Sequence, residues 1–175
     1  MQAFVDESRR GDTYLLAAAV VELPNLSRLR TRVRGLLLPG QREVHFRREN
    51  TARRKFVLAR LAEFGARVDI YRTDCRANEE RARQKCLIRL VDDLLDVEGR
   101  RLVLDTRDER NKHDLLTIRT ALGKRARDSH LLYEHADSAW EPLLWIADMV
   151  VGCYGLGGDW ARRTAPMIGS VQRLD

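Results

Sequence analysis

Cysteine is scarce in this sequence and has no ligand-like spacing. The three cysteines, Cys75, Cys86 and Cys153, lie far apart and form no CxxC or Cys/His pattern. This distribution excludes a disulfide framework and a zinc site as the source of stability. With 175 residues, 44% of them hydrophobic and 33% charged, the chain is long enough to bury a core without such cross-links. We therefore expect a single domain over residues 1–175.

Long apolar runs and processing signals are also missing. The longest apolar run, residues 15–21, is far too short to span a bilayer. The N-terminal segment MQAFVDES contains an acid at position 6 and no basic stretch followed by an apolar one, unlike a secretory signal. The sequence has no low-complexity linker and no internal repeat. Together these absences predict a cytoplasmic protein without membrane association.

Positive charge is in excess and unevenly distributed. The formal net charge is +6, and residues 28–60 alone contain eleven basic residues against two acids, Glu43 and Glu49. A local field of this strength suits a polyanion, of which nucleic acid is the commonest. Arginine-rich helices can also be merely well solvated, and the low lysine content can reflect genomic base composition. On charge alone, nucleic acid is the favoured partner.

The hydrophobic pattern predicts strands and helices that alternate late in the chain. Strands are expected at residues 2–6, 13–21, 66–73, 101–105 and 130–134, with a hairpin turn over 7–12. Helices are expected at residues 24–38, 51–64, 78–97, 110–123 and 142–154. Asn50 is the expected N-cap of the second helix, and Gly65 follows its end. Residues 43–46 fit either a strand or a loop, and the glycine-rich segment 155–175 is expected to be irregular.

This order of elements predicts an α/β fold. The tight first connection implies an antiparallel pair, and the later alternation implies a parallel half. We expect a mixed sheet of about five strands with helices on both faces, in which residues 24–64 form a basic helical insertion.

Two aspartates follow apolar segments that are expected to be strands. Asp6 ends the segment 2–6 and Asp105 ends the segment RLVLD. If the two strands are parallel neighbours, both carboxylates lie at the same edge of the sheet, where sites of α/β folds form. Like charges at that distance repel unless a divalent cation neutralises them, and hard oxygen ligands select Mg²⁺ or Mn²⁺.

Three further residues have chemistry suited to such a site. Asp148 lies within the apolar run LLWIADMVV, where an unpaired carboxylate is costly to bury. Glu43 and His45 lie in EVHF, and both point the same way if that segment is extended. Two strand-end acids, one mid-helix acid and a Glu-x-His beside a basic segment are what a two-metal phosphodiester-cleaving site requires.

Each of these residues also has a plainer interpretation. Acids at strand ends often cap turns or the next helix, which applies to Asp6 and to Asp105 or Asp108. Asp148 can be the ion-pair partner of one of the many arginines, and His45 can be an ordinary surface or core histidine. The individual signals are weak, and only their combination favours a catalytic site.

Five segments, FVDES, TYLLAAAVV, EVHF, RLVLD and HADSAWEPLLWIADMVVG, resemble the bacterial family called "domain of unknown function 3800". The resemblance covers nearly the whole chain in the expected order, and its most specific parts are the first and last segments. It implies an RNase H-like (ribonuclease H superfamily) fold with acids at the strand ends and in the last helix. The metal ligands implied by this resemblance are Asp6, Glu43, Asp105 and Asp148.

The resemblance also implies supporting residues and has two departures. The resemblance implies that Glu7 and His45 lie close by and that Asp137 and Ser138 shape the rim. His45 is our further catalytic candidate, which would position water or assist proton transfer to the leaving group. Our secondary candidates are Glu7, Ser8, Asp108 and Ser138. The family usually has Gly after DES, whereas here two arginines precede Gly11, which implies a wider first turn. Trp145 stands where the family often carries Gln, a change that bears on substrate contact or partner packing.

Two hypotheses of different classes follow. The first is a Mg- or Mn-dependent nuclease or related phosphoryl-transfer enzyme, with two metals that activate water and stabilise the leaving 3′ oxygen. Its phosphate-binding residues are expected to be Arg47, Arg48, Arg53 and Arg54. The second is a non-catalytic RNase H-like module of a defence or mobile-element system that binds nucleic acid or a protein. A homodimer or other protein assembly is a further possibility, which rests only on Trp140 and Trp160.

Overall fold

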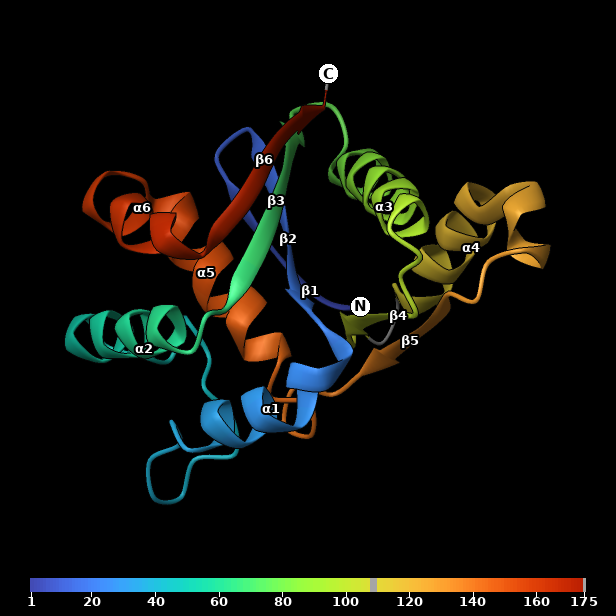
Figure 1. Ribbon diagram of the computed structural model, residues 1–175. Helices are drawn as coiled ribbons and strands as arrows, with labels where there is room; N and C mark the ends of the chain where they lie inside the picture. Colours follow the sequence, from blue (N-terminus) through green and yellow to red (C-terminus); the bar gives the residue numbers. More distant parts are fainter. Residues whose placement is uncertain (108–109, 175) are drawn as a thin grey trace.

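The computed structural model describes residues 1–107 and 110–174 (Figure 1). Six strands form one mixed sheet in the order β5-β4-β1-β2-β3-β6. The strands are β1 (Gln2–Arg10), β2 (Thr13–Val21), β3 (Arg67–Asp74), β4 (Arg101–Asp105), β5 (Leu132–Ala136) and β6 (Ile168–Leu174). β2 is antiparallel to both of its neighbours, β1 and β3, whereas β4 and β5 run parallel to β1. The predicted α/β class with a mixed sheet is confirmed.

Helices cover both faces of the sheet (Figure 1). The helices are α1 (Leu26–Arg34), α2 (Thr51–Glu63), α3 (Glu79–Asp96), α4 (Asn111–Leu122), α5 (Leu144–Leu156) and α6 (Gly158–Thr164). One face carries α1, α2, α5 and α6, and the other carries α3 and α4. Because α5 is apolar on almost every side, it lies buried between the sheet and α2, in contact with β1 and β2. None of the described helices is long and apolar enough to cross a membrane.

Side chains of β1 alternate between two separate hydrophobic cores. Phe4 belongs to the core beneath α5, whereas Ala3 and Val5 belong to the core beneath α3 and α4. Successive side chains of a strand point to opposite faces. The same alternation therefore directs Asp6 toward α5 and Glu7 toward α3.

Local signals explain how the helices around the site begin and end. The side chain of Asn50 accepts a hydrogen bond from the Arg53 N–H and caps α2, as the sequence predicts. Gly65 has φ +73, a conformation that lets the chain leave α2 and enter β3. The segment that could have been a strand or a loop, residues 43–46, is a loop.

Three expectations about the elements were wrong. β1 does not end at Asp6 but continues to Arg10, so that the hairpin turn is confined to Gly11 and Asp12. The sheet has six strands rather than about five, because the tail after residue 155 is not irregular. It forms α6 and the edge strand β6, which pairs in parallel with β3. No residue of β6 is fully buried, since half-buried and exposed side chains alternate along it, so the strand lacks the apolar run that marks a central strand.

Candidate active site

A small acidic pocket lies where β1, β4, α5 and the loop before α2 meet. Nine residues line this pocket: Asp6, Glu43, Val44, His45, Asp105, Ser138, Leu144, Trp145 and Asp148. All five residues predicted from the sequence to be catalytic are therefore brought to one place, from four segments of the chain. Asp108, a secondary candidate, lies outside the described residues.

The parallel pairing of β1 and β4 brings the first two aspartates together. The last paired residues of the two strands are Val5 and Leu104, and Asp6 and Asp105 come immediately after them. Asp6 Oδ1 accepts a hydrogen bond of 2.7 Å from the Glu7 N–H, and Asp105 Oδ1 accepts one of 3.0 Å from the Thr106 N–H. Parallel neighbours thus place two carboxylates side by side, as predicted, although Asp6 lies within its strand rather than at its end.

Helix α5 supplies the third aspartate and anchors the loop that carries the histidine. Asp148 Oδ2 accepts a 2.6 Å hydrogen bond from the Phe46 N–H and lies 3.7 Å from His45 Nδ1. That histidine nitrogen also accepts a hydrogen bond of 3.1 Å from the Arg47 N–H, so Nδ1 is an acceptor in the neutral ring. The proton of neutral His45 is therefore on Nε2. Among the described residues, no arginine lies within ion-pair distance of Asp148, which removes the plainer interpretation of this aspartate.

Glu43 is held at the rim by two side chains. The Ser138 hydroxyl donates a hydrogen bond to Glu43, and Arg48 Nη1 lies 2.6 Å from the Glu43 carboxylate. The Trp145 indole N–H in turn donates a 2.7 Å bond to the Ser138 carbonyl. Trp145 is only 3% exposed, so its ring packs in the core beneath the pocket. The aromatic residue at this position supports the rim and is not a surface for partner contact.

Burial and mutual repulsion alter the acidity of the pocket. Burial raises the pKa of Asp6 well above its usual value, and the neighbouring Asp148 charge raises it further. Burial raises the pKa of Asp148 to about 6 although the Phe46 N–H opposes the rise, and burial followed by the Asp6 charge raises the pKa of Asp105 to about 6. The pocket therefore has an excess of negative charge, which protons partly neutralise.

The donor atoms fit a hard divalent cation. Carboxylate oxygens from three aspartates and a glutamate are the ligand type that Mg²⁺ and Mn²⁺ prefer. A cation would relieve the repulsion that raises these pKa values. Over residues 1–107 and 110–174, no three His, Cys, Asp or Glu side chains are arranged about one point to hold an ion as they stand. The donor atoms of the pocket therefore match the metal in chemical type, whereas their arrangement in this part of the chain does not surround one point.

Two of the secondary candidates do not line the pocket. Ser8 is half-buried further along β1 and is absent from the lining. Glu7 was expected nearby but faces the opposite side of the sheet, where it pairs with Arg83 and Arg107 and accepts a hydrogen bond from Tyr14. The reason is the strand alternation: because β1 continues past Asp6, the next side chain must point away from α5.

A buried charge network surrounds Glu7 and was not found from the sequence. Arg83 binds Asp114 through Nε and Nη2 at 2.6 and 2.7 Å, and His135 Nε2 lies 3.0 Å from the same carboxylate. The Arg83 hydrogen bonds lower the pKa of Asp114 despite its burial. The only sequence signal was an arginine within the apolar stripe of α3. Through Arg107, two residues after Asp105, the network ties the end of β4 to β1.

The four arginines expected to bind phosphate have different surroundings. Arg53 donates to the Leu36 carbonyl and lies 3.7 Å from Glu49, and Arg54 donates a 2.9 Å bond to the Phe46 carbonyl. Both guanidinium groups therefore hold the site loop in place. Arg47 and Arg48 are exposed, and the latter points its guanidinium at Glu43. The predicted phosphate contact remains untested for all four, and the exposed pair has the better access to a ligand.

Comparison with known proteins agrees with the architecture. No protein-family model and no curated protein matches the sequence. A solved structure of the PCNA:RNase HII complex from Archaeoglobus fulgidus is similar, with a TM-score of 0.56 and 13% sequence identity. The match covers 86% of this chain and 69% of that chain. The fold is RNase H-like. At this identity the likeness establishes the fold and not the activity.

Proposed function

We propose that this protein is a metal-dependent nuclease that cleaves phosphodiester bonds of nucleic acid at the acidic pocket. The observation that carries the proposal is the convergence of Asp6, Asp105 and Asp148 from two parallel strands and a buried helix onto one pocket. Mg²⁺ or Mn²⁺ bound to these carboxylates and Glu43 would supply activation of water and neutralisation of the leaving oxygen. The RNase H-like fold is compatible with this chemistry but does not by itself imply it.

The residues of the pocket divide the remaining tasks. Because the His45 Nδ1 accepts a hydrogen bond from the Arg47 N–H, the Nε2–H of neutral His45 remains to donate a hydrogen bond to the leaving 3′ oxygen or to position water. Exposed Arg47 and Arg48 bind phosphates beside the pocket. Ser138 holds Glu43 in place through its hydroxyl. The arginine contacts are made to the phosphate backbone of nucleic acid and not to its bases, so we expect little sequence preference.

Membership of the family called "domain of unknown function 3800" is part of the same proposal. It rests on the five sequence segments that resemble the family. Four of these segments, FVDES, EVHF, RLVLD and the HADSAWEPLLWIADMVVG run, contribute residues that line the acidic pocket.

A cleavage assay tests the proposal. End-labelled single-stranded and duplex DNA, the corresponding RNAs and an RNA–DNA hybrid are incubated with the protein and Mg²⁺ or Mn²⁺. We expect cleavage of at least one substrate, and loss of cleavage by EDTA and by Asp6→Asn. Asp12→Asn is the matched control, since Asp12 is exposed at the tip of the same hairpin. If all five substrates stay intact with either metal, the protein is not a nuclease and the non-catalytic binding module takes its place.

A further inference from the structure

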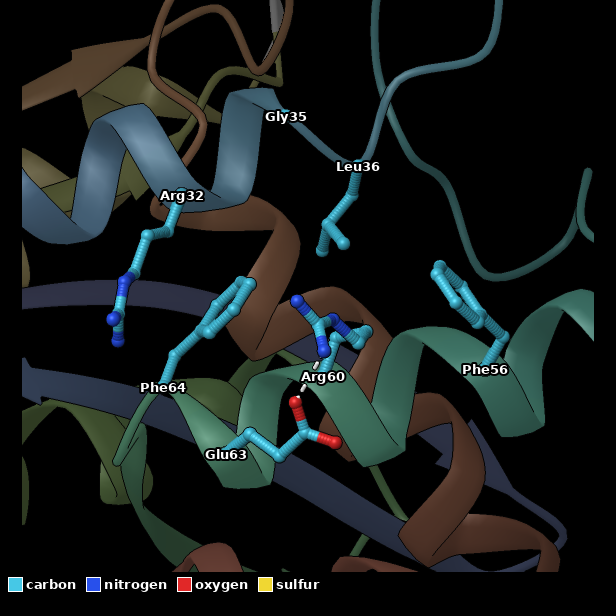
Figure 2. Close-up of a pocket in the computed structure, with 7 residues that line it drawn as sticks. All are labelled: Arg32, Gly35, Leu36, Phe56, Arg60, Glu63 and Phe64. Atoms are coloured by element: carbon cyan, nitrogen blue, oxygen red, sulfur yellow. Dashed lines mark hydrogen bonds and ion pairs between the residues drawn. The ribbon is translucent and has the colours of Figure 1, made fainter.

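A groove between α1 and α2 lies apart from the acidic pocket. It encloses about 430 Å³, and we call it the α1–α2 groove. It is lined by Arg32, Gly35, Leu36, Phe56, Arg60, Glu63 and Phe64. Figure 2 shows Arg32 and Leu36 on the side of α1, and Phe56, Arg60 and Phe64 along α2.

Aromatic rings and guanidinium groups alternate along this groove. Arg32 and Arg60 lie 5.3 and 5.4 Å from the centre of the Phe64 ring. Arg60 lies between the two phenylalanines, and Phe56 exposes 49% of its surface to solvent. A half-exposed phenylalanine on a helix with a buried face of its own does not serve the core, which Val57, Leu58 and Leu61 fill. Flat rings beside cations are a surface on which nucleobases stack.

The charge of the two helices favours an anionic ligand. Together α1 and α2 contain eight basic residues and one acid, Glu63, which is paired with Arg60. An excess of this kind attracts the phosphate backbone, and the arginines can bind it in a bidentate manner. An acidic peptide would match the charge but not the alternation of rings and guanidinium planes.

We propose that the α1–α2 groove binds a single-stranded segment of nucleic acid, with a base stacked on Phe56 and phosphates on Arg32 and Arg60. Duplex DNA keeps its bases stacked on one another, so it offers no free base face to these rings. The groove and the acidic pocket share one segment of chain: Leu36 lines the groove, and Glu43 lines the pocket. The choice of nucleic acid as the ligand rests on the proposed function. The binding experiment that tests it does not require the protein to cleave the ligand.

Fluorescence anisotropy with an oligothymidylate of about 15 nucleotides, in EDTA, tests this proposal. Phe56→Ala is expected to weaken binding about tenfold without changing the salt dependence, and Phe56→Trp to restore it. Arg32→Gln and Arg60→Gln are each expected to lower the slope of log affinity against log salt by roughly 0.7. The matched controls are Leu116→Ala on α4 and Arg81→Gln on α3, which are exposed on the opposite face.

A second ligand separates stacking from charge. An abasic oligonucleotide of the same length keeps the phosphates but offers no base, so its affinity should be lower and insensitive to Phe56→Ala. Equal binding of the two oligonucleotides, or of a double-stranded competitor, would overturn the proposal. Polyglutamate that binds with the same sensitivity to Phe56→Ala would assign the groove to an acidic protein partner instead.

The outcomes for the groove and for the nuclease are distinguishable. A protein that cuts nucleic acid while Phe56, Arg32 and Arg60 variants bind normally has the proposed function but no groove site. A protein that binds oligothymidylate through the groove but cuts no substrate has the site without the proposed activity. Absence of oligonucleotide binding by the unaltered protein contradicts the groove proposal directly.

Discussion

The Phe46 N–H donates a 2.6 Å hydrogen bond to Oδ2 of Asp148. This bond joins the loop that carries Glu43 and His45 to the helix that carries the third aspartate of the pocket. Phe46 itself packs its ring under Arg54, whose guanidinium lies 4.0 Å from the ring centre. Geometry at the acidic pocket thus depends on one loop residue that has no chemistry of its own.

Replacing Asp148 separates the structural role of its oxygen from its charge. Asp148→Asn keeps an acceptor for the Phe46 N–H and removes a repelled carboxylate, so this variant should be at least as stable as the original protein in EDTA. Asp148→Ala leaves the N–H without a partner, and we expect it to be less stable than Asp148→Asn by about 1–3 kcal/mol. Urea unfolding measures both. Equal stability of the two variants would show that the Phe46 bond contributes nothing.

Close packing of Phe46 on α5 makes a second residue critical. A Cβ added at Gly152, one turn after Asp148, would overlap the Phe46 ring. Gly→Ala inside a helix normally stabilises by roughly 0.5–1 kcal/mol, but here we expect Gly152→Ala to destabilise by about 1–3 kcal/mol and to reduce cleavage. The Phe46→Ala background provides the control, since the added methyl group then meets no ring. If Gly152→Ala is stabilising with Phe46 present, the packing argument is wrong.

The raised pKa values predict an unusual pH dependence of stability. Burial raises the pKa of Asp105 and of Asp148 to about 6, so the folded protein binds protons there that the unfolded chain releases near pH 4. The stabilising contribution that the protonated Asp105 and Asp148 carboxyl groups make to the free energy of unfolding is therefore fully present below pH 4. It is lost as the pH rises through 6. In EDTA, the melting temperature of Asp105→Asn relative to the original protein should increase from pH 5 to pH 7. A difference that stays constant over this range would contradict the shift.

On the face of the sheet that α3 and α4 cover, Arg83 neutralises the charge of two buried carboxylates. It pairs with Glu7 and binds Asp114 in a bidentate manner. Arg83→Met leaves both acids without their partner, and we expect it to lower the free energy of unfolding by about 3–5 kcal/mol. Arg81→Met on the exposed side of α3 is the matched control, with an expected change within about 0.5 kcal/mol. A small effect of Arg83→Met would mean that water or other residues satisfy Glu7 and Asp114.

Sequence patterns located the acidic pocket well because its residues interrupt apolar runs. Asp105 follows a buried strand and Asp148 lies within a buried helix. Burying a carboxylate at such positions costs free energy, so an acid that is found there indicates a function. The meeting of Asp6 and Asp105 was expected only if their two strands are parallel neighbours, and β1 and β4 meet this condition. The predicted length of β1 was wrong, because the polar residues after Asp6 are typical of a turn although they pair with β2.

Tertiary contacts determined what the sequence could not predict. Glu7 stands beside Asp6 in the chain, but the pleat directs it to the other face. Arg53 and Arg54 look like phosphate ligands in a basic segment, yet their guanidinium groups bind the backbone carbonyls of Leu36 and Phe46. Edge strand β6 was missed because its pattern is half-polar and its partner, β3, lies far away in the sequence.

Calorimetric titration with Mn²⁺ near pH 6 tests most directly whether the acidic pocket is a metal site. Burial raises the pKa of Asp105 and of Asp148 to about 6, so both groups are partly protonated at this pH. Metal binding should therefore release protons, which titrations in buffers of different ionisation enthalpy reveal. We expect Mn²⁺ to bind and to raise the melting temperature of the original protein and of Asp12→Asn, and to do neither in Asp6→Asn. Binding that is unchanged in Asp6→Asn, or no binding to the original protein, would contradict the account.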